Sequence, residues 1–274
     1  MSEFNIFGLN TRAEEAKLFI LPVAWELTTS YGRGTYNGPT AIEQASGQID
    51  LYDIELSDFY KQGIYLLDRD PNLFELHRLA DASAREIFKA AESGGTIPNE
   101  QAENQKVVNS ANEEMVNVVY SYCREILNNM PNMGVLGGDH SVPLGLIKAV
   151  GEKHRGDFGI LHIDAHADLR DSYQGFPHSH ASIMNNVLSL DFAPKKLVQV
   201  GIRDFCEEEI ERINLDSRIE CFFDYELQKK LFSGSTWKSL CEEIVSSLPE
   251  KVYISFDIDG LSPDNCPHTG TPVP

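Results

Sequence analysis

Short apolar runs that alternate with longer amphipathic stretches constrain the fold of this chain more than any other feature of its sequence. Apolar runs of this length, bounded by turn residues, predict buried strands, and apolar residues at helical spacing predict helices between them. Such alternation predicts a mostly parallel central sheet covered by helices, a three-layer α/β/α sandwich. The expected strands span residues 18–23, 64–67, 133–136, 158–163, 197–200 and 252–256, and the clearest helices span residues 73–91, 113–127, 143–150 and 237–248.

The composition limits the number of domains and the kinds of partner. A chain of 274 residues with 42% hydrophobic content can bury one large core, so we expect a single domain over residues 1–274. The formal net charge is −19, which opposes binding to nucleic acid or an anionic membrane. The same charge would attract metal ions and guanidinium compounds, although solubility alone also explains an acidic surface.

The cysteines and the chain start favour a cytoplasmic protein. Five cysteines lie far apart, with no spacing typical of a disulfide framework or a zinc knuckle. The first residues lack the basic and apolar segments of a signal peptide, and no stretch approaches the ~20 apolar residues that span a bilayer. Residues 94–105 are polar and predict a surface loop or an interface insertion.

Polar side chains follow three of the expected strands at the point where each strand ends. Gly-Gly-Asp-His at residues 137–140 follows the third strand, Asp164 follows the fourth, and Asp257 follows the last. Parallel sheets place ligands at the carboxyl ends of their strands, so we expect these side chains to meet. The converging donors would be His140, Asp164, His166, Asp168, Asp257 and Asp259.

These donors predict a two-metal site. In an extended segment alternate side chains face one way, so Asp164, His166 and Asp168 would share a side. Crowded carboxylates stay ionised only if cations neutralise them, and two divalent ions would also lower the pKa of a shared water. A carboxylate-rich set without cysteine suits Mn²⁺ better than Zn²⁺. Each motif alone has a plainer interpretation, since Asp139 or Ser141 can cap a helix and residues 256–260 can form a turn.

These motifs resemble those of the ureohydrolases, the family of arginase and agmatinase. The matching stretches are Gly-Gly-Asp-His-Ser at 137–141, Ile-Asp-Ala-His-Ala-Asp at 163–168, Ser-Phe-Asp-Ile-Asp-Gly-Leu at 255–261, and Thr-Gly-Thr-Pro at 269–272. Residues 28–32 and 38–42 are similar to the family's amino-terminal region. The resemblance implies an arginase-like fold, a trimer or hexamer, and hydrolysis of a linear guanidino C–N bond to urea and an amine.

The resemblance also implies a role for each residue of the site. One ion would be held by His140, Asp164, Asp168 and Asp257, and the second by Asp164, His166, Asp257 and Asp259. Two Mn²⁺ ions per subunit are expected, with another divalent ion such as Ni²⁺ as the alternative. Asp168 would pass a proton to the leaving nitrogen, and His180 would relay protons or contact substrate, while Thr271 would line the substrate pocket. His162 is expected to be a buried, hydrogen-bonded core histidine, and His178 to have a surface or loop role.

The segment after the second motif bears on the substrate. Arginase-type members have a polar Asn and Ser set there, whereas this chain has Leu169, Arg170 and Asp171. The segment resembles agmatinase-type members, so we expect a small cationic guanidino substrate without an α-carboxylate, with agmatine first. Arginase-type or guanidinobutyrase-type substrate choice is the alternative.

The resemblance implies a missing part and two alternative functions. Family members continue beyond the position of Pro274, through a stretch that includes a glutamate that holds the guanidinium group. We therefore expect a single ureohydrolase domain that lacks the family's carboxyl-terminal part. One alternative is a metal-binding but catalytically impaired member that acts as a partner subunit. The other is a deacetylase-like amidohydrolase, which holds one metal ion.

Overall fold

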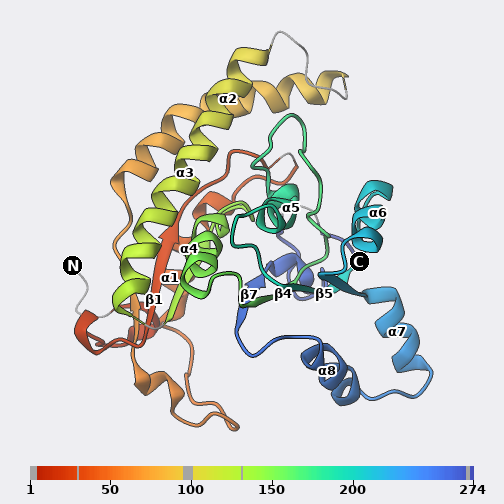
Figure 1. Ribbon diagram of the computed structural model, residues 1–274. Helices are drawn as coiled ribbons and strands as arrows, with labels where there is room; N and C mark the ends of the chain where they lie inside the picture. Colours follow the sequence, from red (N-terminus) through yellow and green to blue (C-terminus); the bar gives the residue numbers. More distant parts are fainter. Residues whose placement is uncertain (1–4, 30, 95–100, 131, 270–271) are drawn as a thin grey trace. The chain divides into compact units, whose positions relative to one another are not determined.

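The computed structural model describes residues 5–29, 31–94, 101–130, 132–269 and 272–274 (Figure 1). The chain divides into two compact units. The amino-terminal unit comprises Met1–Thr28 and Arg33–Ala149, and the carboxyl-terminal unit comprises Thr29–Gly32 and Val150–Pro274. The expectation of a single domain over residues 1–274 stays a prediction.

The amino-terminal unit contains a three-stranded parallel sheet in the order β2-β1-β3. Its strands are β1 (Leu18–Val23), β2 (Ile64–Leu66) and β3 (Asn132–Gly137). Leu18 of β1 pairs with Ile64 of β2 on one side and with Asn132 of β3 on the other. All three strands lie where the apolar runs predicted them.

Two long helices, α2 (Pro71–Gly94) and α3 (Ala102–Asn129), pack against each other in this unit (Figure 1). Their fully buried side chains include Ile87, Met115 and Val119. The expected loop over residues 94–105 is wrong at Gly94, the last residue of α2, and at residues 102–105, which form the first turn of α3. Residues 95–100 lie outside the described residues. The unit also contains α1 (Gly38–Ser46), the start of α4 (Leu144–His154), and 3₁₀ helices at Ile6–Gly8, Ala13–Glu15, Thr35–Asn37 and Phe59–Gln62.

The carboxyl-terminal unit contains a four-stranded parallel sheet in the order β6-β5-β4-β7. Its strands are β4 (Gly159–Ile163), β5 (Lys196–Ile202), β6 (Ile219–Phe223) and β7 (Val252–Phe256). The sequence did not predict β6, because Glu220 interrupts its apolar run. That carboxylate forms an ion pair with Lys196 at 2.7 Å and accepts a hydrogen bond from Ser247 Oγ at 2.8 Å.

Helices α7 (Asp224–Phe232) and α8 (Trp237–Ser246) build the core of this unit on β5 and β6. The buried cluster comprises Val198, Phe222, Leu227, Leu240 and Ile244. The unit also contains α5 (Ile183–Leu188), α6 (Glu207–Leu215), and 3₁₀ helices at His180–Ser182 and Ile258–Gly260. Every strand pair within the described sheets is parallel, so the prediction of a mostly parallel α/β protein is confirmed.

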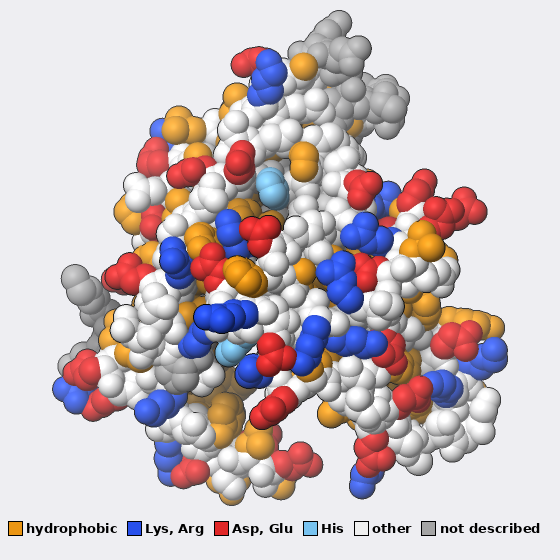
Figure 2. Space-filling view, in the orientation of Figure 1, with side chains coloured by type: hydrophobic (Ala, Val, Ile, Leu, Met, Phe, Trp, Pro, Cys, Tyr) orange, Lys and Arg blue, Asp and Glu red, His pale blue; other side chains and the backbone are white. Residues whose placement is uncertain are grey.

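The surface carries charges of both signs. Figure 2 shows acidic and basic side chains interspersed over the visible face, among scattered apolar side chains. None of the helices in the described part of the chain has the length and apolar character needed to cross a membrane.

Candidate metal centre

The loop after β4 holds the first group of candidate ligands. The sheet ladder continues one residue past the strand, because the Asp164 N–H donates to the carbonyl oxygen of Val200 at 3.2 Å. The Asp164 side chain is 1% exposed, and its Oδ1 accepts a hydrogen bond from the His166 N–H at 2.7 Å. Ala165 and Ala167 are fully buried. The small alanines therefore let the loop pack tightly while the polar residues between them gather on the other side.

The loop after β7 is tied directly to the loop after β4. The Asp257 N–H donates to Ile163 O at 2.9 Å, and the Asp257 carboxylate accepts from the Asp259 N–H at 3.1 Å. Asp259 Oδ1 in turn accepts from the Ala165 N–H at 3.1 Å. The two loops pack closely at Gly260, because a Cβ there would lie 3.1 Å from the backbone nitrogen of Asp164, a tight contact. These contacts bring Asp259 to the β4 loop.

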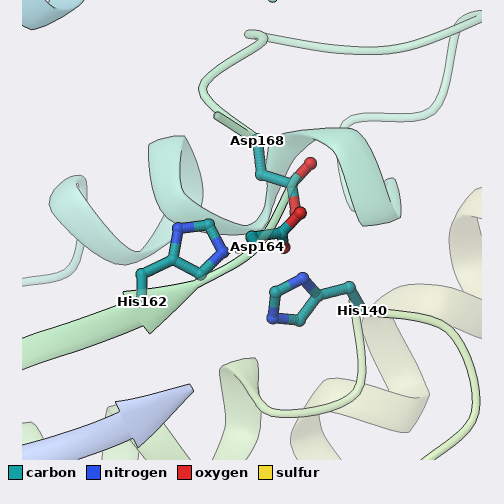
Figure 3. A group of neighbouring side chains, drawn as sticks. All are labelled: His140, His162, Asp164 and Asp168. Atoms are coloured by element: carbon teal, nitrogen blue, oxygen red, sulfur yellow. Dashed lines mark hydrogen bonds and ion pairs between the residues drawn. The ribbon is translucent and has the colours of Figure 1, made fainter. Parts of the chain in front are cut away.

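Two overlapping groups of side chains result. Asp164, His166 and Asp259 each offer a ligand atom, and these atoms lie within 4.8 Å of one another. His166 Nδ1 is 3.0 Å from Asp259 Oδ2 and 3.5 Å from Asp164 Oδ1. The second group contains Asp164, Asp168 and His162, again within 4.8 Å (Figure 3). Asp164 belongs to both groups, as a bridging ligand would.

Asp168 is held in a strained backbone conformation. Its φ of 55° lies in the left-handed region, so it departs from the extended geometry that the alternation of side chains assumed. The Asp168 carbonyl oxygen accepts from the N–H groups of Met184 and Asn185 at 3.0 and 3.3 Å. The next N–H, that of Leu169, donates to the buried carboxylate of Glu209 at 2.9 Å. The strain is thus maintained by hydrogen bonds on the carbonyl group of Asp168 and on the following N–H.

The charges of the buried carboxylates around His166 favour binding of a cation. Burial disfavours a charge on His166, but hydrogen bonds to Asp164 and Asp259, with the charges of Asp259 and Asp168, outweigh it and raise the pKa of His166 to about 11. Asp164, Asp168 and Asp259 are all at most 9% exposed. Buried carboxylates need a compensating positive charge, and a divalent ion would supply it in place of the imidazole proton. The donor set, with carboxylate oxygens and one imidazole nitrogen, therefore fits a hard divalent ion.

The Gly-Gly-Asp-His turn lies in the amino-terminal unit. A Cβ at Gly138 would overlap the carbonyl oxygen of Trp25, so only glycine allows the turn to pass there. Asp139 is 5% exposed and accepts hydrogen bonds from the N–H and hydroxyl groups of Ser141 and from Thr28. Asp139 therefore stabilises the turn itself, five residues before α4 begins at Leu144, and its expected role as the cap of that helix stays a prediction. His140 is half-buried and is drawn in Figure 3; its role as a ligand stays a prediction.

The remaining candidate residues are not among these two groups. Asp257 is half-buried and belongs to neither group of described residues, so its bridging role stays a prediction. His180 begins a 3₁₀ helix, where its ring lies edge-on to Tyr173 with centroids 5.9 Å apart. His178 lies in the turn before it and is half-buried. Thr271 lies outside the described residues.

Three residues that the sequence did not single out support the candidate ligands. Gln199 donates to Ala167 O at 2.7 Å, Glu209 accepts from Leu169, and Arg203 donates to Asp259 O at 2.7 Å. The sequence does contain an indication of a special role for Gln199, because it is a polar residue inside the apolar run of residues 197–200. A polar side chain buried in a strand needs hydrogen-bond partners, and Gln199 has one in Ala167, next to Asp168.

Comparison with known proteins identifies the family. A relative from Synechocystis sp., named N(1)-aminopropylagmatine ureohydrolase, is 28% identical over 96% of this chain and 74% of its own. An agmatinase from Bacillus cereus is 28% identical over 94% of this chain and 73% of its own. The crystal structure of an agmatine ureohydrolase of Thermoplasma volcanium matches 97% of this chain and 77% of that chain, with a TM-score of 0.67 and 21% identity, which confirms the predicted arginase-like fold. The model of the arginase family matches residues 16–274, so the chain belongs to the arginase family.

Proposed function

We propose that this protein is a hydrolase that cleaves the guanidino group of a small cationic amine to release urea, with two divalent ions bound at the carboxyl ends of its strands. The observation that carries the proposal is the convergence of Asp164, His166 and Asp259 within 4.8 Å, with Asp168 beside Asp164. Membership of the arginase family supports the reaction class, and the names of the two relatives support the kind of substrate.

The proposed ligand sets follow the family's motifs. His140, Asp164, Asp168 and Asp257 would hold one ion, and Asp164, His166, Asp257 and Asp259 the other. We propose Mn²⁺, because oxygen donors dominate both sets and cysteine is absent from them. When bound, the ions supply a water nucleophile of lowered pKa and a Lewis acid.

The chain's own residues orient the reacting groups. We propose that Asp168 holds the proton taken from the nucleophile and delivers it to the leaving nitrogen. The hydrogen bonds on the Asp168 carbonyl and on Leu169 N–H fix the backbone from which this carboxylate projects. His180, which follows the Asp168 segment, is proposed as the residue that contacts the substrate or relays the proton, and Thr271 as a pocket residue.

A cationic substrate is supported by charge at the cluster itself. The Asp204 side chain is 56% exposed, and its Oδ2 lies 3.6 Å from His166 Nε2. An exposed carboxylate at the edge of the cluster favours an amine over a carboxylate on the substrate. The overall charge of −19 is weaker support, because Figure 2 shows charges of both signs on the visible face. Agmatine and N(1)-aminopropylagmatine, an agmatine with a further amine, both fit this requirement.

Urea release from a panel of substrates tests the proposal. Protein reconstituted with Mn²⁺ is assayed with agmatine, N(1)-aminopropylagmatine, arginine, guanidinobutyrate and guanidine. We expect one of the two cationic amines to react fastest, and arginine reacting fastest would contradict the assignment. Asp164→Asn should abolish urea release, while the matched change of the exposed Asp191 to Asn should leave it intact.

Metal stoichiometry separates the proposed function from its alternatives. Two ions per chain with urea release support the proposed enzyme. Two ions without urea release from any of these substrates would instead indicate an impaired member acting as a partner subunit, and a single ion would indicate a deacetylase-like site. The expected trimer or hexamer is tested on the same sample by sedimentation velocity.

A further inference from the structure

Three buried side chains form a hydrogen-bonded chain that ends at Asp164, a candidate ligand of the metal centre. Gln199 on β5 contacts His162 on β4. His162 in turn contacts Asp164 in the loop that follows, and Figure 3 draws these last two side chains. Gln199 Nε2 is 2.9 Å from His162 Nδ1, and His162 Nε2 is 2.8 Å from Asp164 Oδ2. Gln199 and His162 are fully buried, and Asp164 is 1% exposed. Solvent therefore does not compete for these contacts.

The orientation of the Gln199 amide is fixed by a backbone carbonyl group. Gln199 Nε2 also lies 2.7 Å from the carbonyl oxygen of Ala167. A carbonyl oxygen only accepts hydrogen bonds, so the atom facing it must be the amide nitrogen, since a rotated amide would set two oxygens against each other. Both N–H groups of Nε2 are then donors, one to Ala167 and the other to His162 Nδ1.

This orientation decides which nitrogen of His162 carries the proton. Because Nδ1 accepts from Gln199, the ring proton lies on Nε2. Nε2–H then donates to Asp164 Oδ2, while the other oxygen, Oδ1, accepts from the His166 N–H at 2.7 Å. One hydrogen bond on each oxygen fixes the plane of the Asp164 carboxylate.

We propose that His162 and Gln199 are positioning residues, which hold the Asp164 carboxylate in the orientation that lets it bridge two divalent ions. The inference rests on the proposed function, because it assumes that Asp164 is a metal ligand. A histidine that only filled the core would need no particular tautomer, and its loss would not change metal affinity if the fold were kept. Partners of metal ligands that act through hydrogen bonds typically contribute about 10- to 100-fold in metal affinity.

Two matched substitutions of His162 distinguish a role in orienting Asp164 from a role in core packing alone. His162→Gln places an amide nitrogen near the position of the imidazole Nε2, whereas His162→Asn ends near the position of Nδ1 and cannot reach Asp164. We expect His162→Asn to weaken Mn²⁺ binding by about 10- to 100-fold in calorimetry, and His162→Gln to recover most of the loss. Circular dichroism confirms that each variant is folded. Wild-type affinity in folded His162→Asn would overturn the proposal.

Two further measurements keep the test decisive. Nitrogen-15 NMR of the metal-free wild-type protein should show the His162 proton on Nε2, and a proton on Nδ1 would overturn the proposal regardless of activity. If His162→Asn does not fold, Gln199→Met removes the amide donor at nearly constant length. The Gln199→Met variant should also bind Mn²⁺ more weakly than wild type, and unchanged affinity would overturn the proposal.

The same measurements separate this inference from the proposed function. Wild-type protein that binds two ions without releasing urea contradicts the proposed reaction, while the affinities of the His162 variants still decide the positioning role. Wild-type protein that binds no Mn²⁺ contradicts both.

Discussion

Arg203 Nη2 donates to the carbonyl oxygen of Asp259 at 2.7 Å, and the rest of its guanidinium group binds the backbone around that residue. Its nitrogens also donate to the carbonyl oxygens of Gly201, Gly260, Leu261 and Val273 at 3.0 to 3.3 Å. One side chain from the end of β5 thus holds the loop after β7 in place. Arg203 thus adds to the contacts of Asp257 and Ala165 that hold Asp259 in the candidate metal centre.

Arg203→Lys should therefore destabilise the carboxyl-terminal unit. Lysine keeps the charge but loses the planar set of donors, so most of these carbonyl groups lose their partner. We expect the free energy of unfolding to fall by at least about 2 kcal/mol, measured by urea denaturation, because each hydrogen bond to a charged group contributes about 1.5–3 kcal/mol and lysine keeps only part of the set. The exposed Arg78→Lys is the control, and an equal effect of both changes would refute this role for Arg203.

Glu209→Gln should disturb the Asp168 segment. The two oxygens of this buried carboxylate accept from the N–H groups of Leu169 and Cys206, each at 2.9 Å. Glutamine can accept only one of them and sets an amide N–H group against the other, which costs about 1–3 kcal/mol. Thermal unfolding should shift down, and urea release should fall because the backbone next to Asp168 is released. Glu211→Gln, on the exposed side of α6, should have neither effect.

The buried thiol of Cys123 should be inert in the folded protein. Burial raises its pKa to about 12, so almost no thiolate is present at neutral pH. Iodoacetamide labelling followed by mass spectrometry should modify the half-buried Cys266 in buffer and Cys123 only in denaturant. Labelling of Cys123 at the same rate with and without denaturant would show that the α3 core opens readily.

The sequence predicted those strands whose apolar runs are uninterrupted, and missed elements that tertiary contacts stabilise. β6 contains Glu220, whose carboxylate is paired with Lys196 on the neighbouring strand and with Ser247. Helix α6 begins with three glutamates, one of which, Glu209, is buried because it binds the Asp168 segment. A single sequence shows neither partner, because both contacts join residues far apart along the chain.

The candidate site was predictable to the extent that its residues lie in short motifs. The spacing of Asp164, His166 and Asp168 predicted a cluster, and the structure brings Asp164 and His166 together with Asp259 from another strand end. The left-handed backbone of Asp168 and the supporting roles of Gln199 and Arg203 were not predictable. They depend on hydrogen bonds between strand ends, which the order of residues along the chain does not specify.

His77 should make the amino-terminal unit less stable in mild acid. It is 7% exposed between the rings of Trp25 and Tyr36, whose centroids lie 5.5 and 4.4 Å from its own. Burial lowers the pKa of His77 from its ordinary value of 6.5, and Arg33 acts in the same direction, against the charges of Asp81, Glu26 and Asp139. Below pH 6.5 the unfolded chain therefore binds a proton that the folded chain resists, so stability falls as the pH drops through that value.

The variant His77→Phe removes this titration and keeps an aromatic ring in the stack. Urea denaturation at about pH 7.5 and about pH 5.5 should show a smaller loss of unfolding free energy for the variant than for wild type. The neutral phenylalanine ring also leaves no unpartnered buried nitrogen, whereas His77 Nε2 has no hydrogen-bond partner within the described part of the chain. Parallel losses in the two proteins would mean that the acid sensitivity of this unit comes from its carboxylates and not from His77.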